Sequence, residues 1–129
     1  MKSYNELVTE ALAVITTISA TEAAERMGDA DTIFVDLRGD RELASTGIIP
    51  GAVHVRRGIL EFVIDPQSPY YNPIFAPEKT FIFYCASGGR SALATRCAQE
   101  MGLKRIVNLG GGLKAWKDAG YALDPYQPK

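Results

Sequence analysis

Strand-like and helix-like segments alternate along the whole of this chain. Short runs of β-branched and other apolar residues are followed by segments whose apolar residues recur at helical spacing. This alternation is typical of an α/β domain built around a mostly parallel sheet. We therefore predict a three-layer α/β/α sandwich with a five-stranded, mostly parallel sheet. The expected strands are 16–19, 32–37, 52–55, 80–85 and 105–109, and the expected helices are 3–13, 20–28, 58–64, 89–101 and 113–119, with one helical turn at 41–44.

Length and charge narrow the class of protein further. A chain of 129 residues fits one domain, and we expect residues 1–129 to form it, with an N-terminal helix at 3–13. The 14 basic residues against 15 acidic ones provide no overall positive field to hold nucleic acid. No apolar run approaches the roughly 20 residues that a membrane-spanning helix needs. We expect a cytoplasmic protein with no nucleic-acid partner and no membrane partner.

The chain has only two cysteines and one histidine. A disulfide framework and the common Cys/His zinc sites each need more residues of these types. We therefore expect no metal and no cofactor, so that the chemistry depends on a few side chains. Cys97 lies on the apolar face of the helix predicted at 89–101, where core packing is its expected role.

Cys85 ends a strand that is expected to be buried on both faces, and a turn of small residues leads from it into a helix. Ligands bind at such strand ends in parallel sheets. Gly88 and Gly89 allow backbone N–H groups to turn inward around one point, and Arg90 adds a cation. A sulfur at that point is expected to be a thiolate with a lowered pKa, and thus a nucleophile without a histidine base. An inert core cysteine is the alternative, which explains the strand but not the turn.

Four segments in this order resemble the motifs of one family, the rhodanese-like sulfurtransferase domain. They are Asp36-Leu37-Arg38 followed by Glu42, the turn GIIPGAVH at 47–54, the loop CASGGR at 85–90 and the segment NLGGGLKAW at 108–116. The resemblance covers about 18–123, and four motifs in the family's order are more specific than any one alone. It implies a rhodanese fold and sulfurtransferase activity.

In this family the cysteine takes sulfur from a donor and passes it on. By resemblance, the Cys85 thiolate attacks the outer sulfur of a small donor such as thiosulfate, becomes a persulfide and releases sulfite. A small thiol, cyanide or a partner protein then accepts that sulfur. The loop N–H groups are expected to stabilise the persulfide anion. The residues expected to bind the substrate and the persulfide are Ala86, Ser87, Gly88, Gly89, Arg90 and Ser91.

Other functions fit the same cysteine. Dual-specificity phosphatases, which are related to this family, place five residues between cysteine and arginine, whereas only 86–89 intervene here. The smaller loop suits one sulfur atom, so we favour sulfur transfer over a phosphatase or an arsenate reductase. A non-catalytic or sulfur-relay binding module stays open, because rhodanese-like domains often act as partners in larger pathways. A redox-sensing thiol is disfavoured by the lack of a nearby resolving cysteine.

One position departs from the family pattern. Thiosulfate-specific members usually carry a basic residue directly after the cysteine, whereas this chain has Ala86. Arg56 and Arg57 follow the strand predicted at 52–55 at the same sheet edge, so they are candidates to replace that charge. Their alternative role is that of solvated surface charges. The physiological donor is therefore left open.

Asp36 and Arg38 end the strand predicted at 32–37 and are expected to support the loop. We expect Asp36 to anchor Arg90 or the loop N–H groups. We expect Arg38 to bind an outer carboxylate such as Glu42. Structural support is thus the role predicted for both residues.

Packing or turn geometry is the expected role of the other conspicuous residues. His54 is the only histidine, and Trp116 is expected in the core. The glycines at 110–112 lack the Lys-Ser/Thr pair of a phosphate-binding loop. We expect them to let their turn pass close to the Cys85 loop.

Overall fold

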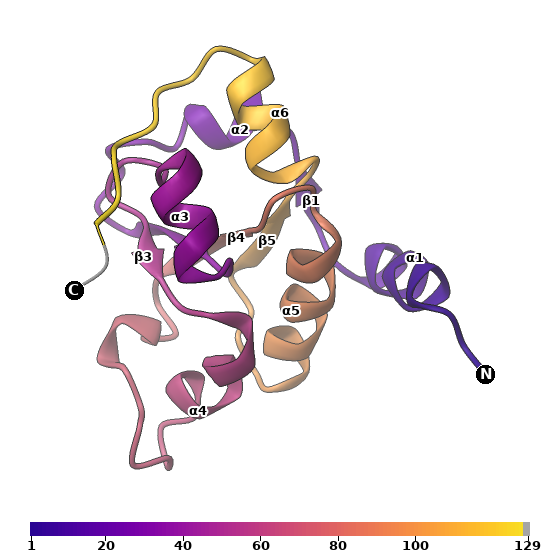
Figure 1. Cartoon of the computed structure of the whole chain (residues 1–129). Coiled ribbons are helices and arrows are strands. Elements are labelled where there is room, and N and C mark those ends of the chain that lie inside the picture. Colours follow the sequence, from indigo (N-terminus) through magenta and orange to yellow (C-terminus); the bar gives the residue numbers. More distant parts are fainter. Residues whose placement is uncertain (128–129) are drawn as a thin grey trace.

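The five predicted strands form one sheet in the computed structural model, which describes residues 1–127 (Figure 1). All neighbouring strands are parallel, in the order β1-β5-β4-β2-β3. The central strand β4 pairs with β2 over its whole length, so its carboxyl end lies in the middle of one sheet edge. The strands are β1 (Thr17–Ile18), β2 (Thr32–Asp36), β3 (Val53–His54), β4 (Thr80–Tyr84) and β5 (Ile106–Leu109).

Helices cover both faces of the sheet, which confirms the predicted α/β/α sandwich. Buried residues of α4 and α5 pack against one face, and buried residues of α2 and α6 pack against the other. The helices are α1 (Tyr4–Val14), α2 (Ala20–Ala24), α3 (Asp40–Thr46), α4 (Leu60–Ile64), α5 (Gly89–Glu100) and α6 (Gly112–Asp118), with 3-10 turns η1 (Arg57–Ile59) and η2 (Pro73–Phe75).

The core divides at β4, whose side chains alternate between the two faces. Phe81 and Phe83 pack in the cluster with α4 and α5, whereas Ile82 and Tyr84 pack in the cluster with α2 and α6. All four side chains are buried, as expected for a strand covered on both faces. Trp116 fills the second cluster, as predicted.

Several predicted elements have different bounds, among them the strand at 16–19, the helix at 20–28 and the helical turn at 41–44. β1 is only two residues long, because this edge strand pairs just with the end of β5. The helix predicted at 20–28 ends at Ala24 and continues as turns to Gly28. The helical turn predicted at 41–44 is a longer helix, α3, with Glu42 accepting the Gly39 N–H (3.2 Å). The position of this helix matters for the site, because Glu42 in its first turn pairs with Arg90 of α5.

The N-terminal helix α1 packs on α5 rather than on the sheet (Figure 1). Ala11 is its one fully buried residue, and the Gln99 side chain donates to the Val14 carbonyl oxygen (2.9 Å). Among residues 1–127, no helix has the length and apolar character needed to cross a membrane.

Candidate active site

Cys85 directly follows β4 and lies at the centre of the carboxyl edge of the sheet. Residues 85–88 turn from this edge into α5, and Cys85 is only 1% exposed. The sulfur faces back into the loop, where Sγ accepts hydrogen bonds from the N–H groups of Gly88 (3.2 Å) and Ser91 (3.4 Å). The loop therefore has the inward-turned amides that the sequence predicts.

Two opposing effects act on the Cys85 thiol. Burial raises its pKa by penalising the charged form, but hydrogen bonding to the charged form lowers the pKa by more. The groups responsible are the Ser91 hydroxyl and N–H and the N–H groups of Gly88 and Ser87. The pKa of Cys85 therefore lies below the ordinary value, which favours the thiolate. Cys97 is the contrast, since burial and a neighbouring carboxylate raise its pKa.

A buried asparagine that was not predicted as a site residue supports this loop. Asn108 of β5 is 1% exposed, and its side-chain amide lies within hydrogen-bond distance of the Ser91 hydroxyl (2.6 Å). That hydroxyl lies 3.5 Å from Cys85 Sγ. The sequence does carry a signal for Asn108, because an asparagine inside an apolar strand must find a hydrogen-bond partner when it is buried.

Backbone hydrogen bonds hold α6 against the loop. The N–H groups of Leu113 and Lys114 donate to the carbonyl oxygens of Cys85 (2.9 Å) and Ala86 (3.1 Å). Gly112 permits this approach, because a Cβ at its position would lie 2.6 Å from the Cys85 carbonyl oxygen. The close passage predicted for the glycine turn is confirmed.

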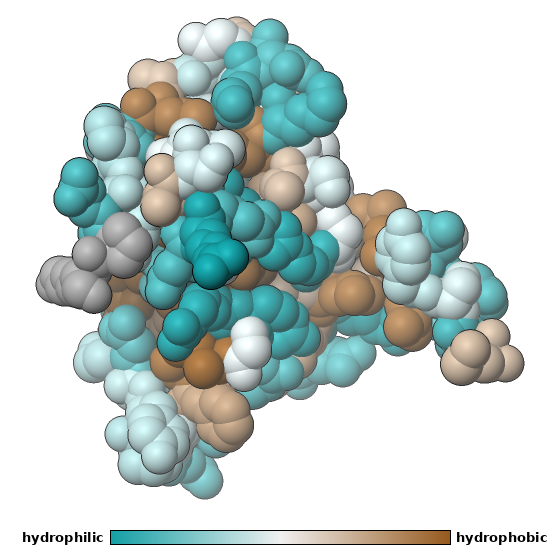
Figure 2. Space-filling model, in the orientation of Figure 1, coloured by the Kyte–Doolittle hydropathy of each residue, from teal (hydrophilic) through white to brown (hydrophobic). Residues whose placement is uncertain are grey.

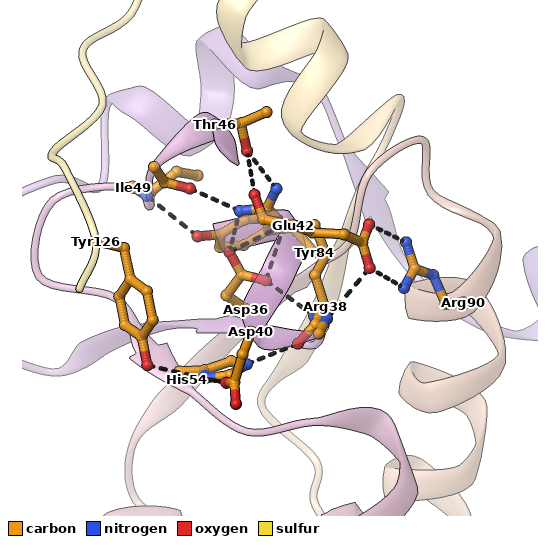
Figure 3. Close-up of polar contacts among 12 residues, drawn as sticks. Asp36, Arg38, Asp40, Glu42, Thr46, Ile49, His54, Tyr84, Arg90 and Tyr126 are labelled. Atoms are coloured by element: carbon orange, nitrogen blue, oxygen red, sulfur yellow. Dashed lines mark hydrogen bonds and ion pairs between the residues drawn. The ribbon is translucent and has the colours of Figure 1, made fainter. Parts of the chain in front are cut away.

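The two arginines nearest the loop have other partners than predicted (Figure 3). Arg38 Nε and Nη2 donate to the Asp36 carboxylate (3.1 and 2.8 Å), and Asp36 also accepts the Arg38 N–H (2.9 Å). Arg90 instead binds both oxygens of Glu42, each at 2.8 Å. The predicted partners, Asp36 for Arg90 or the loop and Glu42 for Arg38, were wrong. The reason is position: Asp36 and Arg38 are two residues apart and buried together, whereas Arg90 lies at the exposed start of α5, opposite α3.

The other two candidate cations pair with carboxylates along the same sheet edge. Arg57 binds Glu61 (2.9 Å), and Arg56 Nη1 lies 3.8 Å from Asp40 Oδ2. Within the part of the chain that the structure describes, neither forms a hydrogen bond with the loop at 85–91. A role for Arg56 and Arg57 beside the sulfur therefore stays a prediction, with no hydrogen bond among the described residues to support it.

His54 has structural contacts at this edge, in line with the packing role expected for it. Its Nε2 lies 2.6 Å from the Arg38 carbonyl oxygen, and its Nδ1 lies 3.3 Å from the Tyr126 hydroxyl. These contacts join the chain after β2 to the C-terminal segment. Across residues 1–127, no group of three or more His, Cys, Asp or Glu side chains is arranged to hold a metal ion.

The pairing of Glu42 with Arg90 makes stability depend on pH in the acid range. Hydrogen bonding from Arg90 lowers the pKa of Glu42 from 4.5 to about 2. The pKa of Glu42 is lower in the folded than in the unfolded protein. The contribution of its ionised carboxylate to the free energy of unfolding is therefore complete above about pH 5 and is lost as the pH falls towards 2. We expect the stability difference between wild type and Glu42→Gln to be constant from pH 7 to pH 5 and to shrink below that. Thermal unfolding across this range measures it, and a difference that persists to about pH 3 unchanged contradicts the pairing.

Comparison with known proteins shows one family and several proteins to which the chain is similar. A family model described as the rhodanese-like domain matches residues 19–119. The Bacillus subtilis protein YtwF, provisionally named a sulfurtransferase, is 34% identical over 103 residues, which are 80% of this chain and 88% of that protein. The human thiosulfate:glutathione sulfurtransferase is 26% identical over 106 residues, covering 78% of this chain and 91% of that one. A solved Rhodopseudomonas palustris structure, described as a protein of unknown function and possible tyrosine phosphatase, is 44% identical, with a TM-score of 0.91 and 96% of each chain covered.

Proposed function

The chain belongs to the rhodanese-like domain family, and we propose that it is a sulfurtransferase that carries sulfur as a persulfide on Cys85. The observation that carries this proposal is the setting of the thiol, with two N–H groups directed at a sulfur whose pKa is lowered. A thiolate held in this way is a nucleophile that needs no general base. The sulfurtransferase names of two relatives that match most of the chain support the same chemistry.

Sulfur passes through the proposed site in two steps. In the first, the Cys85 thiolate forms a bond to the outer sulfur of thiosulfate, the donor's S–S bond breaks, and sulfite leaves with the electron pair. In the second, an acceptor thiolate forms a bond to the outer sulfur of the persulfide, the S–S bond to Cys85 breaks, and Cys85 leaves as a thiolate. Cyanide can replace the acceptor thiol, which then gives thiocyanate. The N–H groups of Gly88 and Ser91 point at Cys85 Sγ, where they stabilise the thiolate that attacks in the first step and leaves in the second.

The rest of the loop shapes the site around that sulfur. Ala86, Ser87 and Gly89 supply the walls of the short turn. Arg90 stays paired with Glu42, and its attraction to the Cys85 thiolate acts over a longer distance. We therefore assign Arg90 a supporting electrostatic role rather than direct contact with the donor.

A phosphatase is the second candidate, because the Rhodopseudomonas palustris protein is described as a possible tyrosine phosphatase. Two features of this chain favour sulfur transfer. Only residues 86–89 separate Cys85 from Arg90, which makes a small loop. The Arg90 guanidinium is also occupied by a carboxylate, so a phosphate ester would have to displace Glu42 to reach it.

We propose a small sulfur donor such as thiosulfate and a low-molecular-weight thiol as acceptor. The printed name of the human relative includes both thiosulfate and glutathione. A relay in which another protein gives or takes the sulfur uses the same persulfide. A non-catalytic domain has no need of the persulfide. Formation of the persulfide therefore separates such a domain from both an enzyme with small substrates and a sulfur relay between proteins.

Mass spectrometry after treatment with a donor tests the proposal. We expect thiosulfate to add one sulfur to the Cys85 peptide and none to the Cys97 peptide, because only Cys85 has a lowered pKa. Addition of cyanide should remove that sulfur as thiocyanate. Hydrolysis of an aryl phosphate without any sulfur adduct favours the phosphatase. No adduct from thiosulfate, mercaptopyruvate or glutathione persulfide favours a non-catalytic module.

A further inference from the structure

A cavity of about 320 Å³ opens beside the Cys85 loop, between α3 and α6. Ala86, the residue directly after the nucleophile, forms part of its wall. This volume lies at the lower end of small-molecule sites and is larger than an inorganic anion such as thiosulfate needs. Figure 2 shows hydrophilic side chains over both helices. The side chains that line this α3–α6 cavity are Arg38, Glu42 and Thr46 on one side and Leu113, Lys114, Lys117 and Asp118 on the other.

Carboxylates already neutralise Arg38, which lines the α3 side of the cavity, and Arg90 of α5, which pairs with the lining residue Glu42. Arg38 is bound to Asp36 at 2.8 Å, and both side chains are buried. Glu42 in turn is bound to Arg90 at 2.8 Å. An anion that enters the cavity therefore gains little from these arginines unless it first breaks an existing pair.

The available positive charge comes from α6. Lys114 and Lys117 are three residues apart, so they lie on the same face of the helix, and both line the cavity. Lys114 shares its charge with Asp118 (2.7 Å), but both side chains are mostly exposed and such a pair is weak. Within residues 1–127, Lys117 has no carboxylate within ion-pair distance. Lys117 is thus the cation in this wall that is free to bind a ligand.

The backbone fixes these lysines relative to the reactive sulfur. The N–H groups of Leu113 and Lys114 bind the carbonyl oxygens of Cys85 and Ala86 (2.9 and 3.1 Å). The first turn of α6 therefore cannot move without moving the catalytic loop. A ligand held by these lysines consequently lies near Ala86, which lines the same cavity.

We propose that the α3–α6 cavity binds the anionic part of a small thiol substrate, with Lys117 as the main contact and Lys114 assisting. The substrate class is a low-molecular-weight thiol whose carboxylates lie several bonds from the sulfur, such as a cysteine-containing peptide. The inference rests on the sulfurtransferase function proposed above. The bond changes are those of the second step: the acceptor sulfur bonds to the outer persulfide sulfur, and Cys85 leaves as a thiolate.

A comparison of an anionic and a neutral acceptor tests this subsite. Persulfide-loaded protein is reacted with glutathione, which carries two carboxylates, and with 2-mercaptoethanol, which carries none. In Lys117→Glu we expect the ratio of the two kcat/KM values, glutathione over 2-mercaptoethanol, to fall about three- to tenfold. The fall should come mainly from KM and should shrink at high salt, because screening weakens exposed charges.

Lys104→Glu is the matched control. Lys104 is an exposed lysine just before β5, at the opposite edge of the sheet from Cys85. The variant makes the same change in net charge, and we expect it to leave the acceptor ratio unchanged. An unchanged ratio in Lys117→Glu, or an equal fall in both variants, overturns the proposed subsite.

A binding measurement separates the subsite from the reaction. S-methylglutathione keeps both carboxylates but has a blocked sulfur, and we expect its binding to shift the NMR amide signals of Ala86 and Leu113. Binding should weaken in Lys117→Glu and not in Lys104→Glu. Wild-type protein that forms the persulfide but does not bind this probe disproves the subsite alone. Protein that binds the probe but forms no persulfide disproves the proposed function alone.

Discussion

Replacement of Cys85 by serine is expected to lower sulfur transfer by about three orders of magnitude or more. Serine is similar in size and can accept the same N–H hydrogen bonds, but its hydroxyl does not ionise near neutral pH. The N–H groups of Gly88 and Ser91 then face an uncharged oxygen, and no persulfide can form on it. Thiocyanate formation and the mass of the donor-treated peptide at this position measure the loss.

Cys97→Ser is the matched control, because it makes the same chemical change at the other cysteine of the chain. Cys97 lies on α5 with its Sγ 3.5 Å from Glu61 Oε2, away from the Cys85 loop. We expect this variant to form the adduct and to turn over like wild type. Turnover in Cys85→Ser within tenfold of wild type refutes the persulfide mechanism, provided that both variants unfold at similar temperatures.

The sheet was predictable because its central strands are buried on both faces. β2 and β4 read as continuous apolar runs, which leave little doubt about strand type. The edge strands β1 and β3 are only two residues long, and such short elements carry too little pattern to define their ends. α3 is a different case, because the contact that begins it, from the Gly39 N–H to Glu42, is local to the sequence and could have indicated a full helix rather than one turn.

The loop around Cys85 was predictable for a different reason. A nucleophile, four small residues and a helix start are contiguous in the sequence, so local geometry alone directs the N–H groups inward. The arginine partners were not predictable in this way. Either carboxylate, Asp36 or Glu42, could have paired with either arginine. Only the position of α3 opposite α5 decides that Glu42 pairs with Arg90.

The lysines of α6 had no sequence signal of their own. On a short amphipathic helix, Lys114 and Lys117 read as ordinary solvated residues. Their place beside Ala86 results from the glycine turn that brings α6 onto the loop. In the proposed subsite, these lysines supply a positive charge that the residue directly after Cys85 does not provide.

Removal of the Asp36 carboxylate is expected to cause a large loss of stability. Arg38 is 2% exposed, and besides Asp36 it binds Thr46 Oγ1 and the Gly47 carbonyl oxygen, both at 2.7 Å. Asp36→Ala leaves this guanidinium buried without its countercharge. Breaking a buried pair in this way costs about 3–5 kcal/mol in the free energy of unfolding. Urea denaturation of wild type and variant measures the difference.

Two further variants separate the effect of charge from that of side-chain size. Asp40→Ala removes an exposed carboxylate 3.8 Å from Arg56, and we expect it to cost less than about 1 kcal/mol. Asp36→Leu combined with Arg38→Met should regain much of the stability lost in Asp36→Ala, because no buried charge is then unpaired. Equal losses in Asp36→Ala and Asp40→Ala contradict the buried pair. Arg38 also lines the α3–α6 cavity. Equal losses would therefore mean that the Arg38 charge is available to an anion, which weakens the proposal that Lys117 is the main contact.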